Sequence, residues 1–364
     1  MDLRAFRASF PALERLVWLN TATVPPGATP VLEAVRRALA DWERGEFSWQ
    51  AWEADAYATR GLFAAMLGVD QESVALMSSV AEAASTVAAT LPPGKIVVGS
   101  REFHSNLYPW TALADRGFQV VEVPHRDGVV STGDLAAAVD DGTVLLAVTE
   151  VQSSNGYRVD IPRLAARCRE AGARLFVNLT QSLGALRFDA PAIGADYVVA
   201  HGYKWLLGIR GAAWMHVRQD RIEDLRPHLP NWHTPADPYA DYYGSGQEPA
   251  PGATRLDTSI SWLPWVGSRA ALELLAQVDA AEVEARCLEL SRTFRAGAQE
   301  RGYGLVPEEV PSQTVGVVVP DADALRDRLA QRHVIGAVRG GFLRLGFHGF
   351  NDERDLEAAL DALT

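Results

Sequence analysis

Between about residues 72 and 218, short apolar runs alternate with stretches rich in Ala, Arg and Glu. Each run has the length of one strand and many Val, Leu and Phe residues, whereas the stretches between them have helical composition. Continuous apolar strands that alternate with helices are typical of a mostly parallel sheet covered on both faces. The pattern predicts strands in KIVVGS from Lys95, FQVVEVP from Phe118, TVLLAVTEV from Thr143, ARLFVNLT from Ala173 and DYVVAHG from Asp196.

Polar residues gather at the points where strands of this region are expected to end. In sheets of this kind, ligands bind beyond the C-terminal ends of the strands. The sequence therefore predicts a ligand site that is built from the segments Ser78–Ser79, Ser153–Asn155, Asn178–Gln181 and His201–Lys204.

The regular pattern ends near residue 229. The Pro-, Tyr- and Trp-rich segment 229–252 is expected to be a long ordered loop, and such loops are often functional. A long helical stretch is predicted to begin near Trp265, followed by the strand QTVGVVV, a helix, the strand FLRLGF and a closing helix from Asp352. We therefore expect a large domain at 31–255 and a smaller α+β domain at 256–364, with the segment 1–30 contributing to the small domain and to the site entrance.

Composition narrows the class of protein. The formal net charge is −12 and no Lys/Arg cluster stands out, whereas nucleic-acid-binding proteins usually carry a basic face. No apolar run reaches the length of about 18 residues that a membrane span needs, and the N-terminus lacks the apolar core of a secretory signal. The two cysteines, Cys168 and Cys287, lie in helix-like stretches, which fits a reducing compartment. We expect a cytoplasmic enzyme that acts on a small molecule, without a nucleic-acid or membrane partner.

Lys204 lies in the segment HGYKWLLG, directly after a predicted buried strand. Apolar neighbours such as Trp205 and Leu206 desolvate an amine, which lowers its pKa and frees it for Schiff-base chemistry. A lone lysine more often extends its charged head into solvent along an apolar surface. The segments elsewhere in the chain favour the chemical interpretation of Lys204.

Several segments follow one another in an order that is typical of one enzyme family: LNTATVPP, SSVAEAAS, REFHSNLYPW, VNLTQSLGA, HGYKWLLG and LRLGFHGFN. Together they resemble the class V aminotransferase family of fold type I pyridoxal-phosphate-dependent enzymes, which includes cysteine desulfurases, kynureninase and isopenicillin-epimerase-like proteins. The resemblance implies an α/β fold with a large, mostly parallel sheet flanked by helices, a smaller C-terminal α+β domain, and a homodimer with a shared active site. It implies pyridoxal phosphate on Lys204, and no metal.

The resemblance also implies which residues hold the phosphate of the cofactor. Ser79, Val80 and Ala81 stand at the start of an Ala-rich helix, where amide N–H groups can bind an anion, although an ordinary helix cap explains the local sequence equally well. His201 and Tyr203 match the two positions before the lysine that reach the phosphate, and both can donate hydrogen bonds.

Other matches concern the ring of the cofactor and the substrate. Phe103 matches an aromatic residue that stacks on the pyridine, with core packing as the alternative. Gln181 matches a residue that donates to the phenolic oxygen, and Ser153 lines the same edge. Arg344 matches the arginine that binds the substrate α-carboxylate with its planar fork, and Arg339 is a candidate for a substrate tail.

One further match concerns the partner subunit. In DTSISW, Thr258 and Ser259 match the segment that reaches the phosphate across a dimer interface. Without the resemblance, the same residues are typical of a turn. An isolated arginine in a strand, such as Arg344, is likewise often an edge or ion-pair residue.

Two departures from the family pattern bear on the reaction. Desulfurases carry a mobile cysteine before the C-terminal strand, but no cysteine follows Cys287 here, so a self-sufficient cysteine desulfurase is not expected. Asn178 stands where relatives have an aspartate that pairs with the pyridine nitrogen, and a neutral amide cannot keep that nitrogen protonated.

The sequence favours a pyridoxal-phosphate enzyme that acts at Cα and Cβ of an amino acid, as a carbon–sulfur lyase of the β-elimination type. A class V aminotransferase is the alternative within the family. A relative that binds the cofactor or a partner without turnover is the alternative from another class, although the joint presence of Lys204, Gln181 and Arg344 favours an active enzyme.

Overall fold

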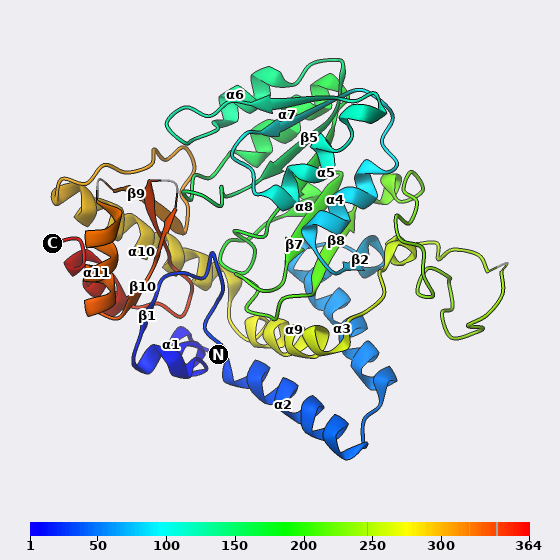
Figure 1. The fold of residues 1–364 in the computed structure, drawn as a ribbon, viewed down its shortest axis with the longest axis horizontal. Coiled ribbons are helices and arrows are strands. Elements are labelled where there is room, and N and C mark those ends of the chain that lie inside the picture. The colour runs from blue at the N-terminus through cyan, green and yellow to red at the C-terminus, as the bar shows by residue number, and fades with distance from the viewer. Residues whose placement is uncertain (246, 320, 340) are drawn as a thin grey trace.

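The computed structural model describes residues 1–245, 247–319, 321–339 and 341–364, and its central feature is a seven-stranded sheet with the order β2-β8-β7-β6-β5-β3-β4 (Figure 1). Strands β4, β3, β5, β6 and β7 pair in parallel, whereas β8 is antiparallel to both β7 and β2. Every predicted apolar run forms one of its strands, so the mostly parallel sheet is confirmed. The strands are β2 (Val74–Met77), β3 (Lys95–Gly99), β4 (Gln119–Val123), β5 (Thr143–Thr149), β6 (Arg174–Asn178), β7 (Tyr197–His201) and β8 (Ala213–Val217).

Helices cover both faces of this sheet, because successive side chains of a strand point to opposite faces. In β5, Leu146 and Val148 pack into one apolar cluster with residues of α3 and α7, while Leu145 and Ala147 pack into another with residues of α4. The fold is therefore α/β, as predicted. The helices of this part are α3 (Trp49–Leu67), α4 (Val80–Ala88), α5 (Tyr108–Thr111), α6 (Thr132–Ala138), α7 (Ile161–Ala171) and α8 (Ala190–Ile193).

The C-terminal part has a separate three-stranded antiparallel sheet of β11 (Ala337–Arg339), β12 (Phe342–Gly346) and β9 (Thr314–Val318). Helices α11 (Ala322–Gln331) and α12 (Glu353–Asp361) accompany it. Near the N-terminus, β1 (Val17–Trp18) pairs in parallel with β10 (Val334–Ile335), and helices α1 (Leu3–Ala8) and α2 (Thr29–Arg44) lie on either side of β1 in sequence. The first residues of the chain therefore lie beside its last hundred, and the division into domains at residues 30 and 255 stays a prediction.

The long helical stretch expected from Trp265 is in fact two helices, α9 (Trp262–Leu275) and α10 (Ala280–Glu300). The predicted start is too late, because Pro264 lies in the first turn of α9, where no helical N–H bond is lost. The break escapes prediction because it is made by a cap: the Asp279 side chain accepts a hydrogen bond from the Ala281 amide and starts a new helix. Among the described residues of 229–252 there is no helix or strand, so the predicted loop is confirmed.

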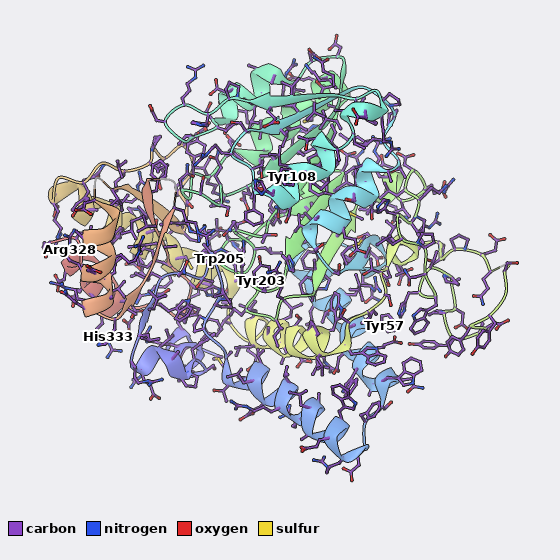
Figure 2. All side chains as sticks on the ribbon, viewed as in Figure 1. Tyr57, Tyr108, Tyr203, Trp205, Arg328 and His333 are labelled. Atoms are coloured by element: carbon purple, nitrogen blue, oxygen red, sulfur yellow. The ribbon has the colours of Figure 1, made fainter. Side chains whose placement is uncertain are left out.

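The described parts of the chain contain no helix with the length and apolarity that a membrane crossing requires. The predicted site segment around Lys204 lies where the large sheet meets the C-terminal part. Figure 2 shows Tyr203 and Trp205 in this central region, and the buried His348 contacts the Trp205 carbonyl at 3.1 Å.

Candidate active site

Lys204 lies on the turn between β7 and β8, and only 7% of its surface is exposed. Its Nζ atom is 5.4 Å from the centre of the Phe103 ring and 5.5 Å from that of Tyr203. Burial, and then the positive charges of Arg344, Arg339 and Arg210, lower the pKa of Lys204 to about 7. The side chain therefore has the properties of a reactive amine, because about half of it is neutral near neutral pH.

A close backbone contact between Gly184 and Trp205 supports the turn that carries Lys204. Gly184 has a φ of +105°, and a Cβ atom at this position would lie 2.2 Å from the Trp205 carbonyl oxygen. Only glycine fits such a conformation and such an approach. The segment that follows Gln181 is thereby packed directly against the lysine turn.

The start of α4 presents the predicted amides. The Ser79 side chain caps the helix by accepting from the Glu82 amide at 3.2 Å, and the Glu82 carboxylate in turn accepts from the Ser78 amide at 2.8 Å. Among the described residues, no acceptor is found for the amides of Val80 and Ala81. These two N–H groups are therefore free to bind an anion at the positive end of the helix.

His201 and Tyr203 lie side by side, with ring centres 4.4 Å apart and perpendicular planes. The Ala212 carbonyl can only accept, so the proton of the neutral His201 ring is on Nδ1, 3.0 Å from that oxygen. Burial lowers the pKa of His201 to about 4, which leaves Nε2 without a proton. The expected donation from His201 to a phosphate therefore requires that the ring take up a proton when the phosphate arrives.

Asn178 is the last residue of β6 and is buried. Its Oδ1 accepts from the Thr180 amide at 3.0 Å, and its Nδ2 donates to the Thr149 hydroxyl at 3.3 Å. Because a backbone N–H needs an acceptor, the amide cannot flip, and its second N–H remains as a donor. Asn178 therefore offers a hydrogen-bond donor, but its amide does not ionise near neutral pH.

Gln181 follows the end of β6, and both the nitrogen and the oxygen of its side-chain amide have hydrogen-bond partners. Nε2 donates to the Ala22 carbonyl and to the Ser153 hydroxyl, each at 3.1 Å, and Oε1 accepts from the Trp205 indole at 3.1 Å. The structure thus brings Gln181 and Ser153 together as predicted. Donation from Gln181 to a phenolic oxygen stays a prediction, and it requires that one of these contacts be exchanged.

The side chain of Arg344 extends from β12 toward Ser153 and is 1% exposed. It donates to the Ser153 carbonyl, and its Nη2 donates to the Thr23 hydroxyl at 2.7 Å, which Arg339 also approaches at 3.4 Å. The Arg344 Nε atom is buried without a partner, and burial lowers the pKa of the guanidinium to about 10. Within the described ranges, the charges that act on Lys204 and Arg344 are those of other arginines, so negative charge is lacking beside these two side chains.

Of the two residues that are predicted to reach a partner subunit, Thr258 lies against β2. The Thr258 amide donates to the Leu76 carbonyl at 3.0 Å, while Ser259 is exposed. Asp257 fixes this segment, since its carboxylate binds Arg60 at 2.6 Å and the Leu76 amide at 2.8 Å. Their role across a dimer interface stays a prediction.

Sequence reasoning missed several residues of this site because their positions depend on contacts between distant segments. Thr23 and Ala22 come from the N-terminal segment, and Thr149 ends β5. Glu102 is adjacent to Phe103 in REFHSNLYPW and could have been singled out as an acidic residue within a matched motif.

The residues fit pyridoxal phosphate. The free amides of Val80 and Ala81 match a phosphate, the exposed face of Phe103 matches an aromatic ring, and the buried amine of Lys204 matches an aldehyde. The unpaired positive charge of Arg344 matches the carboxylate of an amino acid. A sheet of this kind, with a buried lysine of lowered pKa at its C-terminal edge, fits the class of pyridoxal-phosphate-dependent enzymes.

Comparisons with known proteins lead to the same class. A sequence model of the family Aminotransferase class-V matches residues 30–326. The chain is 27% identical to the uncharacterized aminotransferase YcbU of Bacillus subtilis (strain 168), over 98% of this chain and 96% of the relative. It is 27% identical to isopenicillin N epimerase of Streptomyces clavuligerus, over 96% and 95%.

Solved structures share the fold over nearly their whole length. The cysteine desulfurase CsdA of Escherichia coli superposes with a TM-score of 0.84 at 22% identity, covering 100% of this chain and 97% of that one. The cystine C–S lyase C-DES, in complex with cysteine persulfide, superposes with a TM-score of 0.85 at 21% identity, covering 97% and 98%. The chain belongs to the aminotransferase class-V family, and its cofactor is pyridoxal phosphate.

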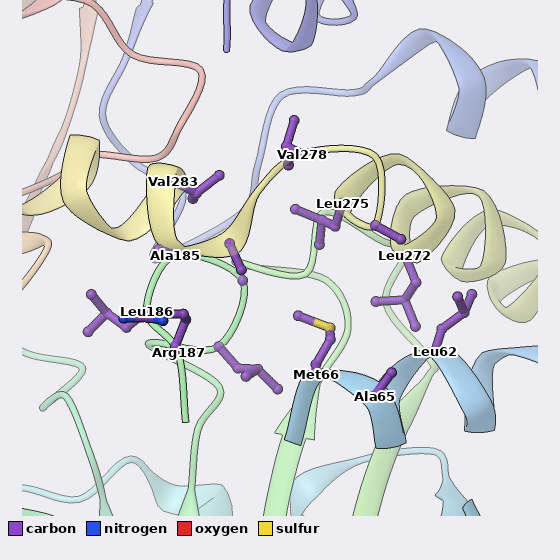
Figure 3. A pocket seen from close by; sticks show the side chains of 14 residues that line it. Leu62, Ala65, Met66, Ala185, Leu186, Arg187, Leu272, Leu275, Val278 and Val283 are labelled. Carbon is purple, nitrogen blue, oxygen red and sulfur yellow. The ribbon is translucent and has the colours of Figure 1, made fainter. Parts of the chain in front are cut away.

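A hollow that Lys204 does not line lies between α3, the segment 183–187 and the α9–α10 connection (Figure 3). It has a volume of about 250 Å³ and is lined mainly by aliphatic side chains, among them Leu62, Met66, Leu275 and Val283. No titratable group of the proposed site lines it. Its one contribution to the site is indirect, because Gly184 forms both its wall and the contact with the lysine turn.

Attachment of pyridoxal phosphate to cofactor-free protein is expected to accelerate as the pH rises from about 6 to about 8. Only the neutral amine attacks an aldehyde, and with a pKa of about 7 the neutral fraction of Lys204 rises from about one tenth to about nine tenths over this range. Stopped-flow absorbance measures the rate. Arg339→Gln removes a like charge and should shift the curve to higher pH, whereas a midpoint near that of an ordinary lysine would contradict the assignment.

Proposed function

We propose that this enzyme removes a β-substituent from an amino acid by elimination, as a carbon–sulfur lyase. The observation that carries the proposal is the orientation of Asn178, whose amide presents a donor where relatives have a carboxylate. The likeness to the fold of a cystine C–S lyase agrees with this choice.

When bound, pyridoxal phosphate supplies an electron sink for the charge that develops at the substrate α-carbon, and the sink is stronger when its ring nitrogen is protonated. Asn178 can donate a hydrogen bond to that nitrogen but cannot share a proton with it. Charge that is weakly delocalised is best discharged by expelling a leaving group from Cβ. Elimination is therefore favoured over transamination, in which the proton removed from Cα is transferred to a carbon of the cofactor.

Two residues of the chain act on the substrate in this proposal. Arg344 binds the α-carboxylate, since its guanidinium is buried, its Nε atom has no partner, and its planar fork can form two parallel hydrogen bonds once a substrate displaces one of its present contacts. Lys204 removes the Cα proton with its Nζ atom, because its pKa of about 7 suits a general base near neutral pH.

The fate of the sulfur follows from the cysteines. Cys168 of α7 and Cys287 of α10 are both buried and free. Burial raises the pKa of Cys168 to about 12 and raises the pKa of Cys287 further, so neither forms a thiolate nucleophile. The sulfur therefore leaves with the departing group instead of binding to the protein.

The double variant Cys168→Ala, Cys287→Ala is expected to retain its turnover, because neither thiol is accessible to substrate. Released keto acid and thiol are measured in the folded, cofactor-loaded variant. The circular dichroism spectrum serves as the folding control, since removing two buried side chains costs about 1–2 kcal/mol each. Loss of turnover in a folded variant would restore a persulfide mechanism.

Transamination is the second candidate, because one full-length relative carries the name of an aminotransferase and because Arg344 and Lys204 would serve either reaction. The two reactions differ in their products: elimination releases a keto acid, ammonia and the leaving group, whereas transamination leaves the amino group on the cofactor. A homodimer and a cytoplasmic location stay predictions under both.

Asn178→Asp is expected to increase transamination relative to elimination, because a carboxylate stabilises a protonated ring nitrogen. Purified protein is incubated with a β-chlorinated and an ordinary amino acid, and both the released keto acid and the aminated cofactor are quantified. The absorbance of the cofactor should change with the variant. An unchanged spectrum and product ratio in folded protein would remove Asn178 from the ring nitrogen and, with it, the basis of the proposal.

A further inference from the structure

A chain of hydrogen bonds runs behind Asn178, across the ends of three neighbouring strands. Glu102 follows β3, Thr149 ends β5 and Asn178 ends β6. Glu102 Oε1 accepts from the Thr149 amide at 2.7 Å, and its Oε2 accepts from the Thr149 hydroxyl. The Thr149 hydroxyl oxygen then accepts from Asn178 Nδ2 and from Asn106 Nδ2, each at 3.3 Å.

The direction of each hydrogen bond follows from the groups that are present. A hydroxyl has one proton, and the two amide nitrogens can only donate to Thr149, so its proton goes to Glu102. The Thr180 amide fixes the Asn178 oxygen from the other side at 3.0 Å. The carboxylate of Glu102 and the Thr180 amide therefore leave one orientation for the Asn178 amide, with a single N–H unused.

We propose that Glu102 is a positioning residue that acts through Thr149 and holds Asn178 as a hydrogen-bond donor toward the ring nitrogen of the cofactor. This inference rests on the proposed function, in which Asn178 faces that nitrogen. It goes further because it assigns a role to a carboxylate that the reaction itself does not touch.

The Glu102 carboxylate should also weaken the interaction between the ring nitrogen and an aspartate introduced at position 178. In Asn178→Asp, two carboxylates would face the one Thr149 proton, which is already given to Glu102. Like charges at this distance oppose each other's ionisation, so the new carboxylate would still raise the pKa of the ring nitrogen, but by less than an aspartate without Glu102 beside it would. Burial already raises the pKa of Glu102, although hydrogen bonds from Thr149 and Asn106 oppose that rise.

Neutralising Glu102 should remove this conflict. In Glu102→Gln, the side-chain oxygen still accepts from the Thr149 amide, and the hydroxyl proton of Thr149 becomes available to the carboxylate that Asn178→Asp introduces. That carboxylate is then free to stabilise a protonated ring nitrogen. Glu102→Gln should therefore have opposite consequences when Asn178 is present and when it is replaced by aspartate.

The test is a double-variant cycle on the cofactor-loaded enzyme: wild type, Glu102→Gln, Asn178→Asp and the two combined. The cofactor absorbance is titrated with pH without substrate, so the readout does not depend on turnover. We expect the titration midpoint of the combined variant to lie about one pH unit or more above that of Asn178→Asp alone. With Asn178 retained, Glu102→Gln should weaken cofactor binding several-fold, because the amide is no longer held.

The outcomes separate this inference from the function on which it rests. Equal midpoints for Asn178→Asp and the combined variant would overturn the role of Glu102 while leaving Asn178 at the ring. No spectral change in any variant would overturn both. If the combined variant does not fold, Thr149→Ser and Thr149→Val replace it. Serine keeps the hydroxyl and should retain wild-type cofactor affinity and absorbance, whereas the valine variant should bind the cofactor several-fold more weakly. Identical behaviour of the two variants would overturn the inference.

Discussion

Replacing Lys204 by Ala is expected to abolish covalent attachment of pyridoxal phosphate and to lower turnover by about 10²–10⁴-fold or more. Both losses would have one cause, since the proposal assigns both the attachment of the cofactor and the movement of the Cα proton to the same Nζ atom. No described residue near it can replace it, because the surrounding cations are arginines, which stay protonated.

The chain is well suited to this test because it contains two lysines, Lys95 and Lys204. Borohydride reduction of the loaded protein, followed by peptide mapping, should place the cofactor on Lys204. Lys95 is the matched control: its Nζ binds Asp140 at 2.6 Å and the Ala138 carbonyl at 2.8 Å, so Lys95→Arg should keep both attachment and turnover. Cofactor recovered on Lys95, or on the Lys204→Ala protein after reduction, would contradict the assignment.

The second large effect is expected for Arg344→Lys, which should weaken substrate binding by about 1–3 kcal/mol, or roughly five- to 150-fold. Lysine keeps the charge but loses the planar fork that binds a carboxylate through two hydrogen bonds. The absorbance of the loaded enzyme without substrate should barely change, because Arg344 is assigned to the substrate. Spectral titration with an amino acid measures the affinity.

A matched control comes from the same part of the chain. Arg328 of α11 donates to the Ala362 carbonyl at 3.1 Å and lies apart from Tyr203 and Trp205, the two neighbours of Lys204 in sequence (Figure 2). Arg328→Lys should therefore leave substrate affinity unchanged. Equal affinity in Arg344→Lys and wild type would remove Arg344 from the substrate site, whereas a changed cofactor spectrum would show that its contacts with Ser153 and Thr23 serve the cofactor pocket instead.

The sequence by itself determined the sheet and the family, and it singled out Lys204 as the candidate for the cofactor. Buried parallel strands are apolar along their whole length, so KIVVGS, TVLLAVTEV and the other runs could be identified from composition alone. Lys204 stood out because a charged residue among apolar neighbours is energetically costly and needs a reason. The ordered motifs added the family, which the comparisons then established.

Tertiary structure alone decided the hydrogen-bond directions and the electrostatics of the site. The tautomer of His201 depends on Ala212 across a turn, and the orientation of Asn178 depends on Thr149 and Thr180. The low pKa of Lys204 depends on burial and on three arginines, two of them more than a hundred residues away in sequence. Such properties depend on which distant segments meet, and a residue pattern along the chain carries no information on partners that only the packed sheet brings within a few ångströms.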